Sequence, residues 1–193
     1  MVTDRTGSIV SGTSAVSKHS EVMMQLYDST IPQFKKVLQN LERWIDKAEA
    51  YAAAKKFDPE VLLTARLAPD QFPFVRQVQI ACDKAKFTAA SLTGKEAPKH
   101  PDTEKTFAEL RKRLHSVITY LDGFTPKDFE RADERVLEPP VLQGKAILGR
   151  DYLWELQLPN LYFHVTTAYA ILRHNGVDLG KADFIGPVKA VER

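Results

Sequence analysis

The chain has 193 residues, of which 44% are hydrophobic and 27% charged, a composition typical of a folded globular domain and not of a disordered chain. Its formal net charge is only +2, and basic residues are interspersed with acidic ones, so neither nucleic acid nor an anionic membrane surface is an expected partner. No apolar run approaches the roughly 20 residues that span a bilayer, and the N-terminus lacks the apolar stretch of a secretory signal.

Cysteine usage and composition also bear on the compartment and the domain limits. Cys82 is the only cysteine and cannot form an internal disulfide, which favours a reducing compartment and predicts a cytoplasmic protein. Residues 1–17 are rich in Ser, Thr and Gly and are expected to form a flexible tail. We therefore expect one helical domain over residues 18–187 and a short C-terminal tail over residues 188–193.

The first long helix is expected over residues 29–55. Ser29 and Thr30 are good capping residues, and Pro32 falls in the first turn, where proline is tolerated. Apolar residues then recur with helical spacing at Phe34, Val37, Leu38, Leu41, Trp44, Ile45, Ala48 and Tyr51. A shorter helical segment is expected over residues 19–27, and Asp58-Pro59 predicts a brief helical turn through residue 65.

The second long helix is expected to begin at Asp70, its cap, and to end at Gly94. One stripe is apolar and consists of Val75, Val78, Cys82, Ala85, Ala89 and Leu92. Apolar residues also lie on the opposite side, mixed with polar ones, and a helix with two apolar sides is usually central in its bundle.

A third helix is expected after a cap at Asp102 or Thr103, with Gly123 as its end. Residues 125–149 contain two adjacent prolines and short extended pieces, which predict a long crossover with a small β-hairpin. A short helix over residues 150–158 then precedes the last long helix, which Pro159 begins and which ends near His174. The elements predict an all-α fold: a four-helix bundle with a long crossover between helices 3 and 4.

The last helix carries the most unusual polar residue, because His164 falls inside its apolar stripe. A histidine in that position must find a hydrogen-bond partner, bind a metal or titrate in a useful range. One interpretation is a core histidine that donates to a backbone carbonyl. The other interpretation is a histidine that takes part in the function of the protein.

Polar residues that could accompany His164 lie on two helices. Gln79 and Asp83 share one side of the second long helix with Arg76 and could face His164 across the bundle, or they could form an interhelical ladder of ion pairs. Asn160 precedes His164 by one turn, where a second metal ligand would stand, and Tyr162 could hydrogen-bond a ligand. A catalytic zinc site usually needs three protein ligands, which this pair does not supply.

Residues 65–70 (ARLAPD) and 76–83 (RQVQIACD) resemble the signature of an uncharacterised domain family grouped with the DinB/YfiT-like metalloenzyme superfamily. Residues 159–176 are similar to the last helix of the same family, and the resemblance covers about residues 27–187. It implies a DinB-like four-helix bundle. In that superfamily a divalent metal is commonly held by one histidine from the second helix and two, four residues apart, from the last.

Only part of that ligand set is matched. The resemblance places His164 on the final histidine and Asn160 on the preceding ligand position, whereas the second helix has no histidine and offers Gln79 or Asp83 nearby. Related members act as thiol-dependent transferases or hydrolases.

Three functions remain open. The first is a small-molecule-binding protein or enzyme that has a degenerate metal triad and a polar pocket centred on His164. In this hypothesis His164 is the catalytic candidate, and the ligand-binding residues are Gln79, Asp83, Asn160 and Tyr162. The second is a metal-dependent enzyme that holds zinc, nickel or iron on His164 and Asp83, although the cofactor is unknown and the absence of a tightly bound metal is favoured. The third is a non-catalytic helical module. A homodimer is expected, and it is compatible with all three.

Overall fold

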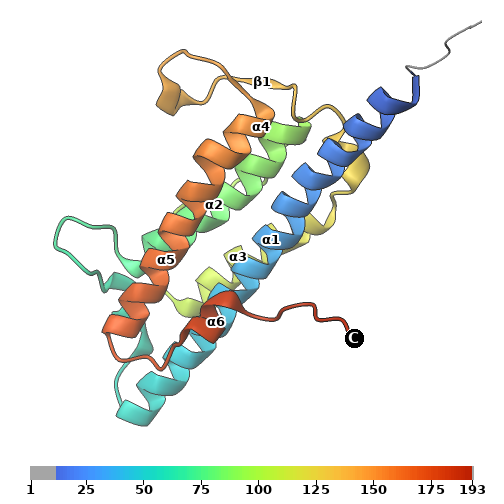
Figure 1. The fold of residues 1–193 in the computed structure, drawn as a ribbon. Coiled ribbons are helices and arrows are strands. Elements are labelled where there is room, and N and C mark those ends of the chain that lie inside the picture. Colours follow the sequence, from blue (N-terminus) through green and yellow to red (C-terminus); the bar gives the residue numbers. More distant parts are fainter. Residues whose placement is uncertain (1–11, 193) are drawn as a thin grey trace, which may run out of the picture.

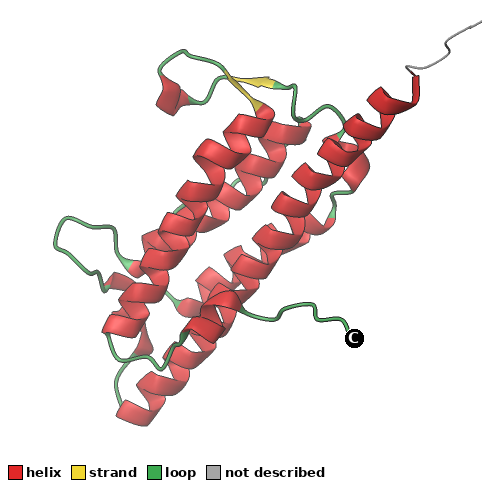
Figure 2. Ribbon diagram, viewed as in Figure 1, coloured by secondary structure: helices red, strands yellow, loops and turns green. Residues whose placement is uncertain are grey.

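The computed structural model describes residues 12–192, with side chains described from Leu26 onward. Within this range four long helices pack side by side along a shared direction (Figure 1): α1 (Gly12–Lys55), α2 (Phe74–Thr93), α3 (Phe107–Asp122) and α5 (Leu158–His174). The strands form only a small two-stranded sheet, and helices make up most of the molecule (Figure 2). The expected all-α helical bundle is confirmed. Among the described residues, no helix combines the length and apolar character needed to cross a bilayer.

Helix α1 is longer than the sequence predicted, because residues 19–27 and 29–55 form one continuous helix. Thr30 does not cap it; its hydroxyl donates back to the carbonyl of Leu26 at 2.7 Å, as mid-helix hydroxyls often do. Pro32 lacks an N–H and removes one helical bond, but the long apolar face packed on the bundle keeps the helix intact. Residues 12–17 fall in α1 and not in the expected tail, whereas residues 1–11 lie outside the described residues.

The segment between α1 and α2 begins with a short 3₁₀-helix, η1 (Pro59–Thr64), as predicted, with Asp58 accepting a hydrogen bond from the backbone N–H of Glu60. Helix α2 begins three residues later than predicted. Asp70 does not cap it; the residue before the helix is Pro73. The helix ends at Gly94 as predicted, because this residue adopts φ +79, a left-handed conformation that glycine adopts without steric cost.

Helix α3 is capped by Thr106 and not by Asp102 or Thr103. The Thr106 hydroxyl accepts from the backbone N–H of Glu109 at 3.1 Å, and the Glu109 carboxylate accepts from the N–H of Thr106 at 3.2 Å. This reciprocal pair satisfies two donors that the helix start would otherwise leave unpaired. Asp102 is used elsewhere, in an ion-pair network. Gly123 ends α3 as predicted.

The crossover after α3 contains the predicted hairpin, with β1 (Val136–Leu137) antiparallel to β2 (Ile147–Leu148). Two 3₁₀ turns, η2 (Pro126–Phe129) and η3 (Pro140–Leu142), lie before and inside it. The chain then continues as one helical stretch through α4 (Gly149–Asp151), the π-helical η4 (Tyr152–Gln157) and α5. Pro159 therefore does not separate two helices. The N–H of Leu158 reaches the carbonyl of Leu153, a π-type bond that carries the helix up to the proline.

The C-terminal segment contains a short helix, α6 (Lys181–Ile185), that the sequence did not predict. Trp44 of α1 holds it in place by donating its indole N–H to the carbonyl of Asp183 at 3.1 Å. The Trp44 ring also stacks on Phe184, with 5.8 Å between ring centroids. Residues 188–192 follow without regular structure, and residue 193 lies outside the described residues.

Candidate functional site

Helices α2 and α5 run side by side in opposite directions (Figure 1), and their shared interface carries the first candidate site. Gln77 near the start of α2 contacts His164 in α5, whereas Ser91 near the end of α2 contacts Tyr152, which precedes α5. We call this interface the α2–α5 seam. It places the predicted His164 opposite a residue that the sequence did not single out.

Gln77 fixes the orientation and the tautomer of His164. The Nδ1 atom of His164 lies 2.7 Å from Oε1 of Gln77, whose Nε2 donates to the carbonyl of Phe72 at 2.9 Å. Since the amide NH₂ is committed to a carbonyl, Oε1 is the acceptor and Nδ1 of the neutral ring carries the proton. The Nε2 atom of His164 then presents a lone pair, for which no described residue provides a hydrogen bond. His164 is thus bonded to a side chain and not to a backbone carbonyl.

The environment of His164 keeps its ring neutral. Burial lowers the pKa of His164 to about 4, and the positive charges of Lys84 and Arg76 act in the same direction. At neutral pH the imidazole is therefore uncharged, and its Nε2 accepts hydrogen bonds.

Asn160 lies one turn before His164 on nearly the same face of α5, because four residues advance the helix by about 400°. Its Oδ1 atom is buried and has no hydrogen-bond partner among the described residues. Such an atom costs about 1–3 kcal/mol of stability and calls for an explanation. The seam therefore holds two unpaired acceptors, Oδ1 of Asn160 and Nε2 of His164.

Tyr162 does not share this face. Two residues advance the helix by about 200°, which turns Tyr162 away from His164. Its side chain is 38% exposed, and burial of part of the side chain raises its pKa.

Gln79 and Asp83 also lie away from His164, on the side of α2 that faces α3 and the loop before it. The amide of Gln79 donates to Glu104 at 2.7 Å. Oδ1 of Asp83 accepts from Arg113 at 2.8 Å and from Lys86 at 2.9 Å. The structure therefore does not bring Gln79 or Asp83 to His164, and their contacts match an interhelical ladder.

Arg113 of α3 is the centre of this ladder, with a side chain that is only 1% exposed. Its guanidinium contacts three carboxylates: Asp83 at 2.8 Å, Asp102 at 2.9 Å and Glu104 at 3.0 Å. These contacts raise the pKa of Arg113 against the opposing effect of burial, so the side chain remains charged. Nearby Cys82 is fully buried, and burial raises the pKa of its thiol to about 12, which leaves it protonated and unreactive.

Lys86 and His100 extend the ladder toward the loop between α2 and α3. The Lys86 side chain is 1% exposed, and its ammonium lies 3.0 Å from Nδ1 of His100. The Nε2 atom of His100 lies 2.9 Å from the hydroxyl of Ser116. An ammonium can only donate, so Nδ1 accepts and Nε2–H donates to Ser116. His100 therefore cannot act as a base toward Ser116 in this arrangement.

The three-histidine metal site that the resemblance implied does not fit these residues. Gln77 stands opposite His164, and Asn160 occupies the position one turn before it. Among residues 26–192, whose side chains the structure describes, no group of three or more His, Cys, Asp or Glu residues could hold a metal ion. Asp83, the other predicted metal ligand, is shared by two buried cations. We therefore derive no chemistry from a metal at this seam.

Gln77 is the seam residue that sequence reasoning missed, although the sequence carries a signal for it. It lies three residues after the buried Phe74 and four before the buried Ala81, so it stands within a buried row of α2. A polar residue within an apolar row marks a buried hydrogen bond. The sequence carries no such signal for Lys86 and Arg113. Charged side chains are rarely fully buried, so neither residue is expected inside the protein.

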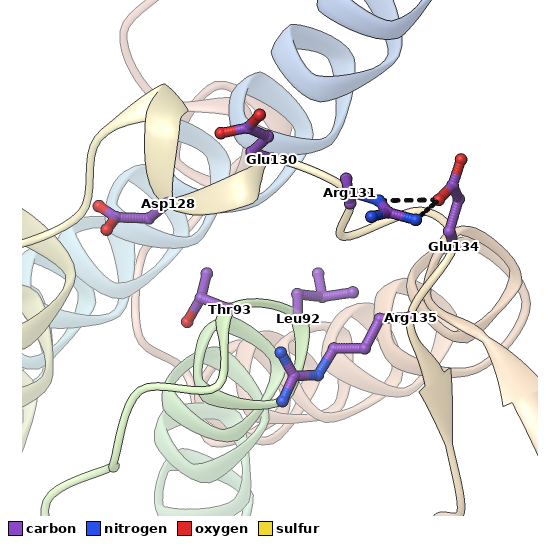
Figure 3. Close-up of a pocket in the computed structure, with 7 residues that line it drawn as sticks. All are labelled: Leu92, Thr93, Asp128, Glu130, Arg131, Glu134 and Arg135. Carbon is purple, nitrogen blue, oxygen red and sulfur yellow. Dashed lines mark hydrogen bonds and ion pairs between the residues drawn. The ribbon is translucent and has the colours of Figure 1, made fainter.

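A separate cavity of about 290 Å³ lies at the C-terminal end of α2, next to the crossover (Figure 3). Arg131 and Glu134 pair across its edge at 3.0 Å, and the Arg135 side chain reaches back over Gly94. A Cβ added at Gly94 would lie 2.9 Å from the Arg135 guanidinium, the end of a flexible side chain that can move, so it is the left-handed φ of +79 that favours glycine here. None of the site residues predicted from the sequence lines this cavity.

Comparisons with known proteins agree with this fold. A family model described as a domain of unknown function (DUF1993) matches residues 26–185, and the chain therefore belongs to that family. The chain is also similar to a DinB family member protein from Shewanella denitrificans, known from a crystal structure. The two are 52% identical with a TM-score of 0.87, over 90% of this chain and 99% of that one. The all-α fold is thus DinB-like. No curated protein matches the chain.

Proposed function

We propose that this member of the DUF1993 family binds a small molecule at the α2–α5 seam, with Gln77, Asn160 and His164 as the polar residues of the site. The observation that carries the proposal is the pair of unpaired acceptors one turn apart on α5: the buried Oδ1 of Asn160 and the Nε2 of His164. A folded chain gains nothing by leaving a buried acceptor unpaired, whereas a binding site needs one available.

The acceptors define the chemistry of the ligand. It would supply two hydrogen-bond donors, such as the N–H or O–H groups of an amide or a polyol. A cationic ligand is disfavoured, because the charges of Lys84 and Arg76 already act against a positive charge at His164. Gln77 would act as a positioning residue, since it holds the His164 ring with Nε2 available.

A matched pair of probes tests the site. We expect acetamide, which has two N–H donors, to shift the ¹⁵N resonance of His164 Nε2 and the side-chain amide resonances of Asn160. N,N-dimethylacetamide has no donor and is expected to shift neither. His164→Phe and Asn160→Leu should each weaken the response to acetamide, whereas His174→Gln, at the exposed end of the same helix, should leave it unchanged.

Two outcomes would contradict the proposal. One is an equal response to both probes. The other is a pair of variants that alter the stability of the protein but leave the response to acetamide unchanged, which would favour a non-catalytic helical module. The homodimer and the cytoplasmic location inferred from the sequence stay predictions, and a sedimentation experiment on the full chain checks the first.

A further inference from the structure

Lys84 of α2 lies on the same face of that helix as Gln77, the residue that contacts His164. The two positions are seven residues apart, and seven residues advance an α-helix by about 700°, within about 20° of two full turns. Side chains on a helix lean toward its N-terminus, so the Lys84 side chain leans toward the part of α2 where Gln77 contacts His164. Lys84 therefore lies along the α2–α5 seam.

The positive charge of Lys84 has no anionic partner among the residues whose side chains the structure describes. Its neighbour in the sequence, Asp83, lies on the side of α2 that faces α3 and accepts there from Arg113 at 2.8 Å. Arg76, the other cation near the seam, is compensated, because it pairs with Asp102. Lys84 is thus the seam cation whose charge is not balanced by a carboxylate.

The electrostatic environment of His164 confirms that Lys84 is close to the ring. Burial contributes most to the lowered pKa of His164, and the next contributions are the positive charges of Lys84 and then of Arg76. Both charges that act on the ring therefore have the same sign. An anion bound between Lys84 and His164 would be attracted by the ammonium, and the ring, which is uncharged at neutral pH, would remain an acceptor for it.

Three groups along the seam thus lack a partner within the described part of the chain: the ammonium of Lys84, Nε2 of His164 and Oδ1 of Asn160. A ligand that satisfies all three carries one negative charge and at least two hydrogen-bond donors. We infer that the α2–α5 seam binds a small monocarboxylate that carries hydroxyl groups. Its carboxylate pairs with Lys84 in a charge-assisted hydrogen bond, and its hydroxyls donate to His164 and Asn160.

This inference rests on the binding site proposed above and adds the charge and the chemical class of its ligand. The two acceptors alone select a donor, such as an amide or a polyol, and they set no charge. Lys84 adds the selection of an anion. The two statements are separable, because acetamide has the donors that His164 and Asn160 require but no charge for Lys84 to bind.

Glycerate, glycerol and propionate separate the charge from the donors. Glycerate has a carboxylate and two hydroxyls, glycerol has hydroxyls without the charge, and propionate has the charge without a hydroxyl. In NMR titrations of the full chain at pH 7 and constant ionic strength, we expect glycerate to shift the ¹⁵N resonance of His164 Nε2 and the side-chain amide resonances of Asn160 in a saturable way. Its affinity should exceed that of either other probe by about tenfold or more.

Two results with these probes would overturn the inference. Equal affinities of glycerate and glycerol would mean that the carboxylate adds nothing to binding. Equal affinities of glycerate and propionate would mean that the hydroxyls add nothing. In either case a response to acetamide would still support the site proposed above, whereas a protein that responds to neither acetamide nor glycerate would contradict both proposals.

A pair of lysine variants locates the charge that binds. Lys84→Met keeps the length of the side chain and is expected to weaken glycerate binding by about tenfold or more, while the response to acetamide stays unchanged. Lys112→Met removes the same charge from the exposed face of α3 and should leave both responses unchanged. Glycerate binding of wild-type affinity in a folded Lys84→Met variant would contradict the inference.

Discussion

The Asn160 side chain bears on both the stability of the fold and the proposed binding site. Its Oδ1 atom is buried and has no partner among the residues that the structure describes, one turn from His164, whose ring Gln77 orients through Nδ1. This Oδ1 atom and Nε2 of His164 are both acceptors, and both are provided by residues at positions that the DinB-like resemblance assigns to metal-binding histidines.

Asn160→Leu tests whether this oxygen costs stability. The leucine has nearly the same shape and removes the unpaired group, so the free energy of unfolding should stay equal or rise by about 1 kcal/mol. Urea unfolding measures the change. A loss of more than about 1 kcal/mol would mean that Asn160 has a partner that stabilises the fold.

At the scale of elements, the join between α2, α3 and the intervening loop depends on buried charges. Arg113 holds Asp83 of α2 and Asp102 and Glu104 of the loop in one cluster. Arg113→Met would leave these carboxylates facing a hydrophobic side chain, and we expect a loss of about 3–5 kcal/mol in urea unfolding. Arg111→Met breaks only the more exposed pairs with Asp46 and Glu49 and should cost about 0–1 kcal/mol. Similar losses in the two variants would contradict this account.

The crossover depends on a close backbone approach at Gly149, where β2 leads into the last helical stretch. Its N–H donates to the carbonyl of Arg135 at 2.8 Å, and an added Cβ would lie 1.9 Å from the carbonyl oxygen of Ala132. Gly149→Ala should therefore destabilise the protein by about 3 kcal/mol or more in thermal unfolding. At Gly180 the nearest atom to an added Cβ is 3.9 Å away, so Gly180→Ala should change stability by less than about 0.5 kcal/mol. A small loss of stability in the Gly149→Ala variant would contradict this prediction and show that the backbone of the crossover can move to make room for the added methyl group.

At the scale of the whole molecule, His164 makes stability depend on pH. Its pKa is about 4 in the folded chain, below the ordinary 6.5, so between these values the unfolded chain binds more protons. Stability should therefore fall as pH is lowered from 6.5 to 4, by about 1–2 kcal/mol once solvent screening of a half-buried group is allowed for.

Urea unfolding of the wild-type protein and of His164→Gln across this pH range measures that contribution. The pKa of His100 is also lowered by burial, and by Lys86 and Arg113, but this effect is the same in both proteins. Parallel curves for wild type and His164→Gln would contradict the prediction.

The sequence predicted the bundle well, because helical periodicity depends on local spacing. It located the ends of α2 and α3 at Gly94 and Gly123, and the hairpin in the crossover. It misplaced the start of α3, because Asp102 and Thr106 are both good caps, and only the buried Arg113 decides that Asp102 pairs elsewhere.

The site was harder to predict than the fold. His164 and Asn160 could be found from their spacing on one helix, but their partner across the seam depends on how α2 is rotated in the bundle. The sequence left open whether Gln79 and Asp83 face His164 or form an interhelical ladder; the packed helix presents Gln77 to His164 and places the other two in the ladder. The paired charges of Lys86 and Arg113 depend on contacts between elements that no local pattern describes.

The central claim is that His164 is a neutral, oriented acceptor, and ¹⁵N NMR of histidine-labelled protein tests it most directly. The account predicts that His164 carries its proton on Nδ1, that Nε2 has the chemical shift of an unprotonated nitrogen at neutral pH, and that the ring titrates with a pKa of about 4. A proton on Nε2 at neutral pH, or a midpoint near 6.5, would contradict it.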